Sequence, residues 1–279
     1  MQSLVLQSDF GLQDGAVAAM YGVAVGQCDK LRICDLTHNI PPYDIWEASY
    51  RLAQTLAYWP AGTVFVSVVD PGVGSERLSV VAKTKQGHYI VTPDNGTLTH
   101  VKLIYGIEAV RQIDETKNRL GGSEASYTFH GRDVYAYTGA RLAAGLIDFT
   151  EVGPEIDVAK VIALPVDPPD IEGDLVSGTI DALDVRYGSL WTSVPRQLFH
   201  QLGIKFGDRV QLRIYHDGRI VHSNQLKYVP SFAAVELGES LLYINSLDRV
   251  AVAINRGSYA RAFNIGPGAD WKVTLELVK

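Results

Sequence analysis

Cysteine is scarce in this chain of 279 residues, which contains only Cys28 and Cys34. Their spacing matches neither a metal site nor a disulfide framework, and we interpret both as partly buried thiols in a reducing compartment. The chain has no apolar run long enough to cross a bilayer, and its first residues lack the basic start and apolar stretch of a secretion signal. We therefore expect a cytoplasmic protein without a membrane partner.

Sequence motifs of several large enzyme classes are also absent. The chain has no Gly-x-Ser-x-Gly elbow, no phosphate loop with Lys-Ser/Thr, no Gly-x-Gly-x-x-Gly after its first expected strand and no His-Glu-x-x-His. The histidines other than His130 do not cluster at metal spacing, so we predict no metal site and no cofactor. Positive charge is not in excess, because the formal net charge is -6, which argues against a broad nucleic-acid surface.

The two halves of the chain differ in their hydrophobic patterns. Over residues 1–164, short apolar or β-branched runs alternate with segments of helical spacing, which is typical of an α/β fold. The expected strands lie at 4–8, 31–36, 63–69 and 89–92, and the expected helices at 16–25 and 45–58. We predict an α/β domain with a mainly parallel sheet covered by helices, which binds substrate and carries the catalytic residues.

A proline-rich stretch follows at 165–172, in which Pro165, Pro168 and Pro169 prevent a helix. We interpret this stretch as a linker. Residues 173–279 contain short strand-like runs separated by turns, with a hairpin signal at 216–219. This pattern favours a small antiparallel barrel or sandwich, and we predict an all-β barrel domain.

Polar side chains gather where the expected strands of the first half end, which is where open α/β sheets bind ligands. The segments concerned are 8–11 with Asp14 beyond it, 70–77, 93–96 and 128–133. Each has a plainer interpretation, because Asp9 could cap a helix and the segment at 94–96 could be only a turn. Likewise, Asp70 and Arg77 could form a loop-closing salt bridge, and His130 could be a hydrogen-bonding residue at a helix start.

Taken together, four ordered motifs point to one family. They are Ser-Asp-Phe-Gly at 8–11, Val-Asp-Pro-Gly-Val-Gly-Ser-x-Arg at 69–77, Pro-Asp-Asn-Gly at 93–96 and Thr-Phe-His-Gly-Arg-Asp at 128–133. The chain thus resembles the S-adenosyl-L-methionine (SAM) hydroxide adenosyltransferases, which are adenosine-forming SAM hydrolases related to SAM-dependent fluorinases and chlorinases. The resemblance covers nearly the whole chain. It implies an α/β domain, a β-barrel domain and a homotrimer with each site between the first domain of one subunit and the second of a neighbour.

The resemblance also implies roles for individual residues. Asp70, Arg77 and His130 match the catalytic set of the water-using members, whereas halide-using relatives carry other residues at the Asp70 and His130 positions. Asp9 is expected to hold the ribose hydroxyls, and Tyr187 to hold adenine. The other expected substrate contacts are Phe10, Asp14, Tyr43, Asn95, Gly131, Asp184, Ser189 and Ser246.

The implied reaction is hydrolysis of SAM to adenosine and L-methionine by attack of water or hydroxide at the ribose C5′ carbon. The sulfonium leaves as neutral methionine and needs no acid, whereas water needs a base to accept its proton. Asp70 and His130 are both candidates for that base, and the sequence leaves the choice open. The alternative functions are a halide-using SAM adenosyltransferase, a non-catalytic nucleoside-binding sensor, and a metal-dependent nucleosidase suggested by the aspartates at 9 and 14.

Overall fold

The computed structural model describes residues 3–278, which divide into two compact units, one ending at Leu164 and the other beginning at Pro165. Residues 162–169 have no regular secondary structure, as expected for a stretch in which proline prevents a helix. The last residues of the expected linker, Asp170–Glu172, instead form strand β8, which pairs with β9 of the second unit. The second unit therefore begins before the end of the predicted linker.

The first unit alternates strands and helices along the chain. Its elements are β1 Ser3–Ser8, α1 Ala16–Gln27, β2 Arg32–Thr37, α2 Ile45–Leu56, β3 Val64–Val68, β4 Ser79–Thr84, β5 Tyr89–Pro93, α3 Thr99–Ile104, β6 Ile107–Gln112, η1 Gly131–Ala136, α4 Tyr137–Ala144, η2 Phe149–Glu151, β7 Glu155–Ile156 and η3 Val158–Lys160. The predicted α/β fold of this half is confirmed, and each expected strand and helix corresponds to an observed one.

The sheet of the first unit is mixed, so the prediction of a mainly parallel sheet is wrong. Its strand order is β2-β1-β3-β5-β4-β6-β7, with β2, β1, β3 and β5 parallel and the remaining pairs antiparallel. The reversal comes from the short turn at 85–88, because strands joined by so few residues can pair only as an antiparallel hairpin. Strands β4 and β6 were not among those expected from the sequence.

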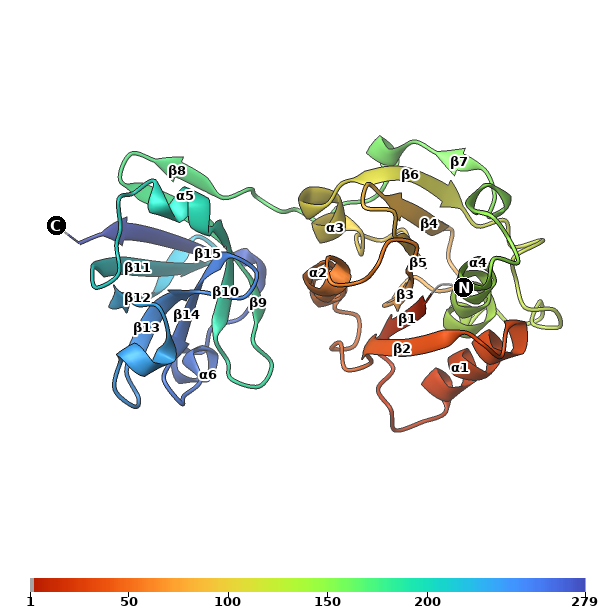
Figure 1. Cartoon of the computed structure of the whole chain (residues 1–279), viewed down its shortest axis with the longest axis horizontal. Coiled ribbons are helices and arrows are strands. Elements are labelled where there is room, and N and C mark those ends of the chain that lie inside the picture. Colours follow the sequence, from red (N-terminus) through yellow and green to blue (C-terminus); the bar gives the residue numbers. More distant parts are fainter. Residues whose placement is uncertain (1–2, 279) are drawn as a thin grey trace. The chain divides into compact units, whose positions relative to one another are not determined.

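Helices cover both faces of this sheet (Figure 1). Alternate residues of a strand point to opposite faces, so Leu4 and Leu6 of β1 pack with α1 and α4, whereas Val5 packs with α2. The same division holds in β3, where Val66 and Phe65 belong to opposite cores. Burial on both faces explains why these strands read as continuous apolar runs in the sequence.

The second unit is built mainly of strands. Its elements are β8 Asp170–Glu172, β9 Leu175–Leu183, β10 Leu190–Pro195, α5 Arg196–His200, β11 Arg209–His216, β12 Arg219–Tyr228, η4 Phe232–Ala234, β13 Ser240–Ile244, β14 Arg249–Ile254, α6 Tyr259–Phe263 and β15 Gly268–Leu277. Strands β9, β10, β14, β13, β12, β11 and β15 pair in that order, and β15 returns to β9, which closes a barrel. The predicted barrel is confirmed. Its pairs are antiparallel except for β12 and β13, which run parallel.

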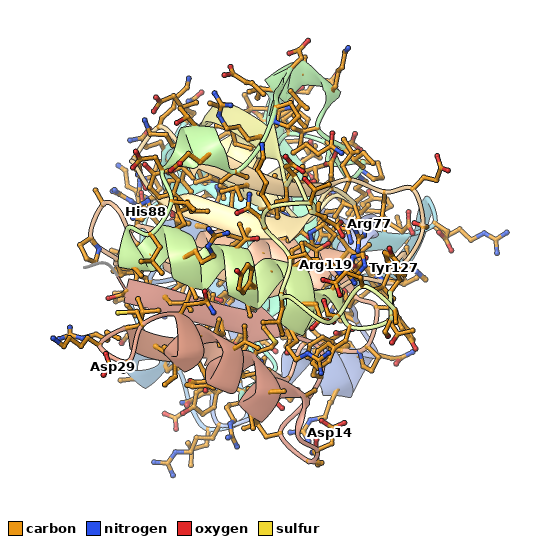
Figure 2. The ribbon with its side chains drawn as sticks, turned by 90° about the vertical axis from the view of Figure 1, so that its right-hand side faces the viewer. Asp14, Asp29, Arg77, His88, Arg119 and Tyr127 are labelled. Atoms are coloured by element: carbon orange, nitrogen blue, oxygen red, sulfur yellow. The ribbon has the colours of Figure 1, made fainter. Side chains whose placement is uncertain are left out.

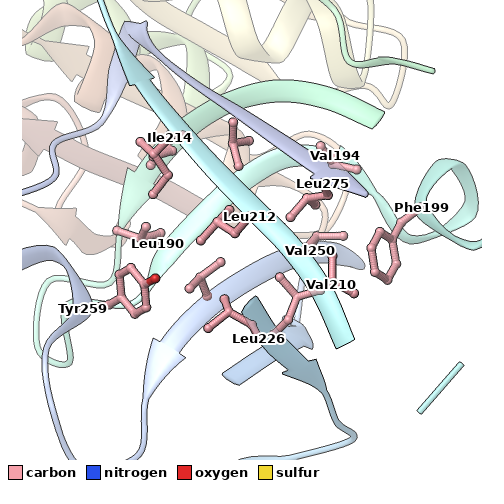
Figure 3. Packing of buried hydrophobic residues seen from close by; sticks show 14 of the residues in the cluster. Leu190, Val194, Phe199, Val210, Leu212, Ile214, Leu226, Val250, Tyr259 and Leu275 are labelled. Carbon is pink, nitrogen blue, oxygen red and sulfur yellow. The ribbon is translucent and has the colours of Figure 1, made fainter. Parts of the chain in front are cut away.

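The barrel is filled by side chains from its inward-facing strand positions. Figure 3 shows this core, with Leu212 and Ile214 of β11 among branched residues of other strands and the rings of Phe199 in α5 and Tyr259 in α6. The hairpin predicted at 216–219 is also present, since Asp217 and Gly218 both have positive φ and join β11 to β12. A two-residue turn of this kind requires two left-handed residues, which Asp-Gly supplies.

Candidate functional site

A pocket opens at the carboxyl end of the parallel strands in the first unit. Asp9 and Phe10 directly follow β1, Asp70 comes two residues after β3, and His130 immediately precedes η1. Because β1 and β3 are parallel neighbours, their carboxyl ends meet at one edge of the sheet. The pocket, of about 280 Å³, is lined by Asp9, Phe10, Pro42, Tyr43, Val68, Asp70, Val73, Thr128, Phe129, His130 and Gly131.

Asp70 and Arg77 form a buried ion pair at this pocket. The Arg77 Nε atom donates to Oδ1 of Asp70 at 2.9 Å, and its NH2 group donates to Oδ2. The two side chains are only 6% and 10% exposed. Burial of a charge to this extent costs free energy unless the charge is paired and hydrogen-bonded. The bidentate contact between guanidinium and carboxylate meets this requirement for both groups.

Two further hydroxyls connect Arg77 and Asp70 by a second route. The NH1 group of Arg77 donates to Ser79 Oγ at 2.9 Å, Ser79 lies 3.2 Å from the hydroxyl of Tyr135, and that hydroxyl donates to Asp70 Oδ2 at 3.3 Å. Arginine can only donate and a carboxylate can only accept, so every hydrogen bond in this ring has a fixed direction. Burial, followed by the charge of Asp70, raises the pKa of Tyr135, which therefore keeps the proton that it donates.

Sequence reasoning did not identify Ser79 or Tyr135 as members of the cluster. Tyr135 lies in the apolar run Val134-Tyr135-Ala136, which reads as core, and it is fully buried. It reaches the site from η1, which begins directly after His130, and the rings of Tyr135 and His130 lie 6.5 Å apart. No sequence signal distinguishes this tyrosine from an ordinary core residue.

His130 accepts a hydrogen bond from Arg77, and this contact determines where its proton lies. The NH2 group of Arg77 is 2.9 Å from Nδ1 of His130. Because a guanidinium cannot accept, Nδ1 must carry the lone pair, and the proton of the neutral ring is on Nε2. Nε2 is buried and has no hydrogen-bond partner among the described residues. The N–H at Nε2 is thus a donor without an acceptor among the described residues, on a side chain that lines the pocket.

The surroundings of His130 favour its neutral form. Burial lowers the pKa of His130 from its ordinary value of 6.5, the nearby Glu115 opposes that effect, and Arg77 adds to it. A protonated ring would place an N–H at Nδ1 directly against the N–H of Arg77. The hydrogen bond that fixes the ring therefore exists only while His130 is neutral.

Asp9 occupies the other side of the pocket on a tightly held turn. Its Oδ2 atom accepts from the backbone N–H of Tyr43 at 2.9 Å, and the N–H of Gly11 donates to the carbonyl of His38. Tyr43 has a positive φ of 69°, which is unusual for a tyrosine, and its side chain is largely exposed at the pocket rim. Gly131 permits close packing, because a Cβ there would lie 3.1 Å from the ring of Phe10.

Two of the predicted contact residues in this unit do not line the pocket. Asp14 is exposed, and its Oδ1 atom accepts from the N–H of Ala16 at the start of α1. Figure 2 shows Asp14 well apart from Arg77. The side chain of Asn95 instead bridges two strand ends, because its Nδ2 donates to the carbonyl of Val69 at 2.8 Å. Both residues have local structural tasks in the described chain.

A second hollow lies in the second unit, beside one of the predicted residues there. Its lining residues are Arg186, Tyr187, Phe232, Ile254, Asn255, Arg256, Gly257 and Arg261, and its volume is about 560 Å³. Asp184 holds the turn that carries Tyr187, because its Oδ1 accepts from the backbone N–H groups of Arg186 and Tyr187. Ser189 is buried, Ser246 is exposed, and neither lines the hollow. The three arginines of this hollow were not predicted as site residues.

Residues 3–278 contain neither a cluster of metal-ligating side chains nor a helix that could span a membrane. No group of three or more histidine, cysteine, aspartate or glutamate side chains is placed so that it could hold a metal ion. Within the same residues, no helix combines the length and apolar character needed to cross a membrane.

The chain thus belongs to the class of two-domain proteins that combine an α/β unit with a closed β-barrel unit. The acidic pocket lies at the strand ends of the α/β unit. Residues 4–153 match the SAM hydroxide adenosyltransferase N-terminal domain, and residues 178–272 match the corresponding C-terminal domain. The chain belongs to the SAM hydroxide adenosyltransferase family.

Named relatives and solved structures agree with this assignment. The (R)-S-adenosyl-L-methionine hydrolase of Salinispora tropica is 34% identical over 96% of this chain and 95% of its own length. A fluorinase of an Actinoplanes species is 30% identical, with 97% of each chain covered. The crystal structure of an uncharacterized conserved protein from Thermotoga maritima, 30% identical, superposes with a TM-score of 0.89 and covers 98% of this chain and 99% of its own.

The fixed direction of the Arg77–His130 hydrogen bond can be measured directly. Nitrogen NMR shifts of histidine-labelled protein should show His130 as the Nε2–H tautomer, titrating below the usual 6.5 because burial and Arg77 disfavour its charge. In Arg77→Met, His130 should titrate at higher pH than in the wild type. An Nδ1–H tautomer in the wild-type protein would contradict the hydrogen-bond assignment, and thermal melts would show whether the variant remains folded.

Proposed function

We propose that this chain hydrolyses SAM to adenosine and L-methionine. The observation that carries the proposal is the buried Asp70–Arg77–His130 cluster, whose carboxylate and imidazole side chains line the same pocket as Asp9. Relatives over nearly the whole chain are named (R)-S-adenosyl-L-methionine hydrolase. An enzyme that uses water needs such a pair of groups, whereas a nucleoside sensor has no use for it.

In the proposed reaction, a water molecule lies between Asp70 and His130. Oδ1 of Asp70 accepts only from Arg77 Nε among the described residues, so it keeps an acceptor site for one water proton. The Nε2–H of His130 donates to the water oxygen and orients its other lone pair toward C5′. The O–C5′ bond forms as the C5′–S bond breaks, the electron pair of that bond goes to sulfur, and the water proton goes to Asp70.

This arrangement assigns different tasks to the two candidate bases. His130 cannot accept a proton at Nδ1 without losing its bond to Arg77, and its Nε2 already carries one. Asp70 is therefore the acceptor, and His130 positions the nucleophile. The apolar members of the pocket, Phe10, Val68 and Phe129, keep water scarce around a sulfonium whose charge disappears during the reaction.

The halide-using alternative fits this pocket less well. A chloride or fluoride ion bound beside the ribose C5′ would have to approach the carboxylate of Asp70, and two negative charges in a site of low dielectric repel each other strongly. Water has no such cost, and it uses the carboxylate as a hydrogen-bond acceptor. The fluorinase relatives share the fold and remain the second candidate activity.

We also propose that the working enzyme is a homotrimer whose site is completed by the second unit of a neighbouring subunit. The pocket of the first unit is smaller than the usual range of about 300–1,000 Å³ for small-molecule sites and is open at Tyr43. The hollow beside Tyr187 supplies an aromatic ring and arginines that suit adenine. Asp184, Ser189 and Ser246 stay predicted contacts of that half, as Asp14 and Asn95 do in the first.

Incubation of the protein with SAM in ¹⁸O-labelled water tests the activity. Adenosine should carry one ¹⁸O at the 5′ position, and methionine should carry none, because the bond breaks between C5′ and sulfur. The rate should be unchanged by a chelator, since a neutral leaving group needs no Lewis acid. A 5′-chloro nucleoside formed in chloride would instead support the halide reaction, binding without turnover would support a sensor, and loss of activity in chelator would support a metal enzyme.

Substitution of the two pocket aspartates should separate binding from chemistry. Asp9→Ala should weaken SAM binding through the loss of charge-assisted hydrogen bonds, each worth about 1.5–3 kcal/mol. Asp70→Asn should bind SAM nearly as well and lose about 100-fold or more in single-turnover rate, because an amide cannot take the water proton. Calorimetry and rapid-quench measurements give the two quantities.

The exposed Asp29 provides a control carboxylate in the same unit, and Asp29→Asn should change neither quantity. Because Asp70→Asn leaves Arg77 buried without its charge partner, both measurements belong at a temperature where melting curves show the variant folded. Loss of binding with an unchanged rate on bound SAM would reverse the two assignments.

Mixed subunits test the shared site. Asp70→Ala and Tyr187→Ala should each be nearly inactive alone, whereas an exchanged mixture should regain activity in those sites that combine one intact pocket with one intact hollow. Native mass spectrometry would confirm the exchange. Exchange without any return of activity would mean that each subunit builds its site alone.

A further inference from the structure

The segment between β6 and η1, residues 113–130, ends at His130 and is held by the buried side chain of Arg119. Arg119 donates through NH1 to Glu115 Oε2 at 2.6 Å, through NH2 to the carbonyl of Ser126 at 2.7 Å, and through Nε to Ser123 Oγ at 3.2 Å. Its side chain is 6% exposed. A guanidinium that bonds to three points of one loop closes that loop, which covers residues 115–126.

The closed loop places Tyr127 against the catalytic histidine. The guanidinium of Arg119 lies over the Tyr127 ring at 4.6 Å from its centroid, and this ring meets that of His130 edge-on with centroids 6.1 Å apart. Figure 2 shows Arg119, Tyr127 and Arg77 gathered in one region of the first unit. The carbonyl of Tyr127 also packs on the 70–77 turn, because a Cβ at Gly74 would lie 3.1 Å from it.

Tyr127 and His130 differ strongly in their exposure to solvent. Tyr127 is 56% exposed, whereas His130 is 4% exposed. Because the exposed Tyr127 ring packs edge-on against the buried His130, it shields part of the histidine from solvent. The Tyr127 hydroxyl is not part of the ring of hydrogen bonds formed by Asp70, Arg77, Ser79 and Tyr135. Tyr127 also does not line the pocket, so substrate contact does not explain its position.

We propose that Tyr127 and Arg119 are positioning residues that shield His130 from bulk solvent and keep it neutral, and so keep it hydrogen-bonded to Arg77 during the reaction. The inference rests on the proposed hydrolysis. The charged groups acting on His130 are Glu115, Arg77, Arg119 and Asp70, and the aromatic rings against it are Tyr127 and Tyr135. Among these, only Glu115 and Asp70 favour a charged imidazolium.

Tyr127 and Arg119 act on His130 through different physical effects. The Tyr127 ring excludes water, and burial is the largest cause that lowers the pKa of His130. Arg119 neutralises Glu115, whose charge otherwise raises that pKa. Removal of either should let His130 become protonated at a higher pH, and the protonated ring loses its hydrogen bond to Arg77.

The test compares pH profiles of SAM turnover for five variants. Tyr127→Ala and Arg119→Met should lose turnover several-fold at about pH 6 and recover by about pH 8.5, because only the acid side of the profile moves. Tyr127→Phe keeps the ring and should follow the wild type. Arg119→Met combined with Glu115→Gln removes both charges and should recover part of the loss at low pH. Tyr58→Ala, an exposed tyrosine outside the site, should be unchanged.

Histidine NMR titration of the same proteins, without substrate, separates the two proposals. An upward shift of the His130 titration in Tyr127→Ala and Arg119→Met supports the inference even if the wild type does not hydrolyse SAM, which would overturn the proposed function alone. An active wild type whose variants lose turnover equally at all pH values, with His130 titrating as before, would overturn the inference and leave Tyr127 and Arg119 with only a structural role.

Discussion

Burial of the Asp70–Arg77 pair governs most of what surrounds it. Two opposite charges removed from water are tolerated only when their hydrogen-bonding groups are satisfied, and here the guanidinium uses Nε, NH1 and NH2 on three partners. The same requirement explains the turn at 70–77, which brings the two residues together, and the placement of Ser79 and Tyr135 beside them. A change to either charge would therefore lower the stability of the folded chain as well as alter the chemistry of the pocket.

The pair also fixes the chemical identity of its neighbours. Since arginine only donates and carboxylate only accepts, Tyr135 must act as a donor to Asp70, and His130 must accept at Nδ1. Among the described residues, the consequence is one acceptor site at Asp70 Oδ1 and one donor at His130 Nε2 that have no further partner. In the proposed reaction this pair holds and deprotonates a water molecule, which is the one reactant that SAM hydrolysis requires besides the substrate.

The fold brings the residues of this cluster together from distant parts of the sequence. Parallel β1 and β3 bring Asp9 and Asp70 to one edge of the sheet, and the π-helical η1 places His130 and Tyr135 on the same side of the first unit. Tyr127, packed against the guanidinium of Arg119, meets the ring of the histidine edge-on. The strand ends, η1 and the segment that carries Arg119 and Tyr127 come from different stretches of the chain and meet only in the folded unit.

Residue types and local spacing were sufficient to predict part of this protein. The alternation of buried runs and helical segments indicated the α/β unit, Asp217-Gly218 indicated the hairpin, and four short motifs indicated the family and the cluster of Asp70, Arg77 and His130. The alternation and the hairpin depend on neighbours along the chain, which is why the sequence alone determines them, whereas the cluster was implied by the resemblance to the family. The tertiary structure decided the antiparallel strands β4 and β6, the local roles of Asp14 and Asn95, the tautomer of His130, and the presence of Tyr135 and Tyr127 beside it. Those outcomes depend on atoms brought together across long separations, such as the 53 residues between Arg77 and His130 or the 65 between Asp70 and Tyr135, and no local pattern specifies such contacts.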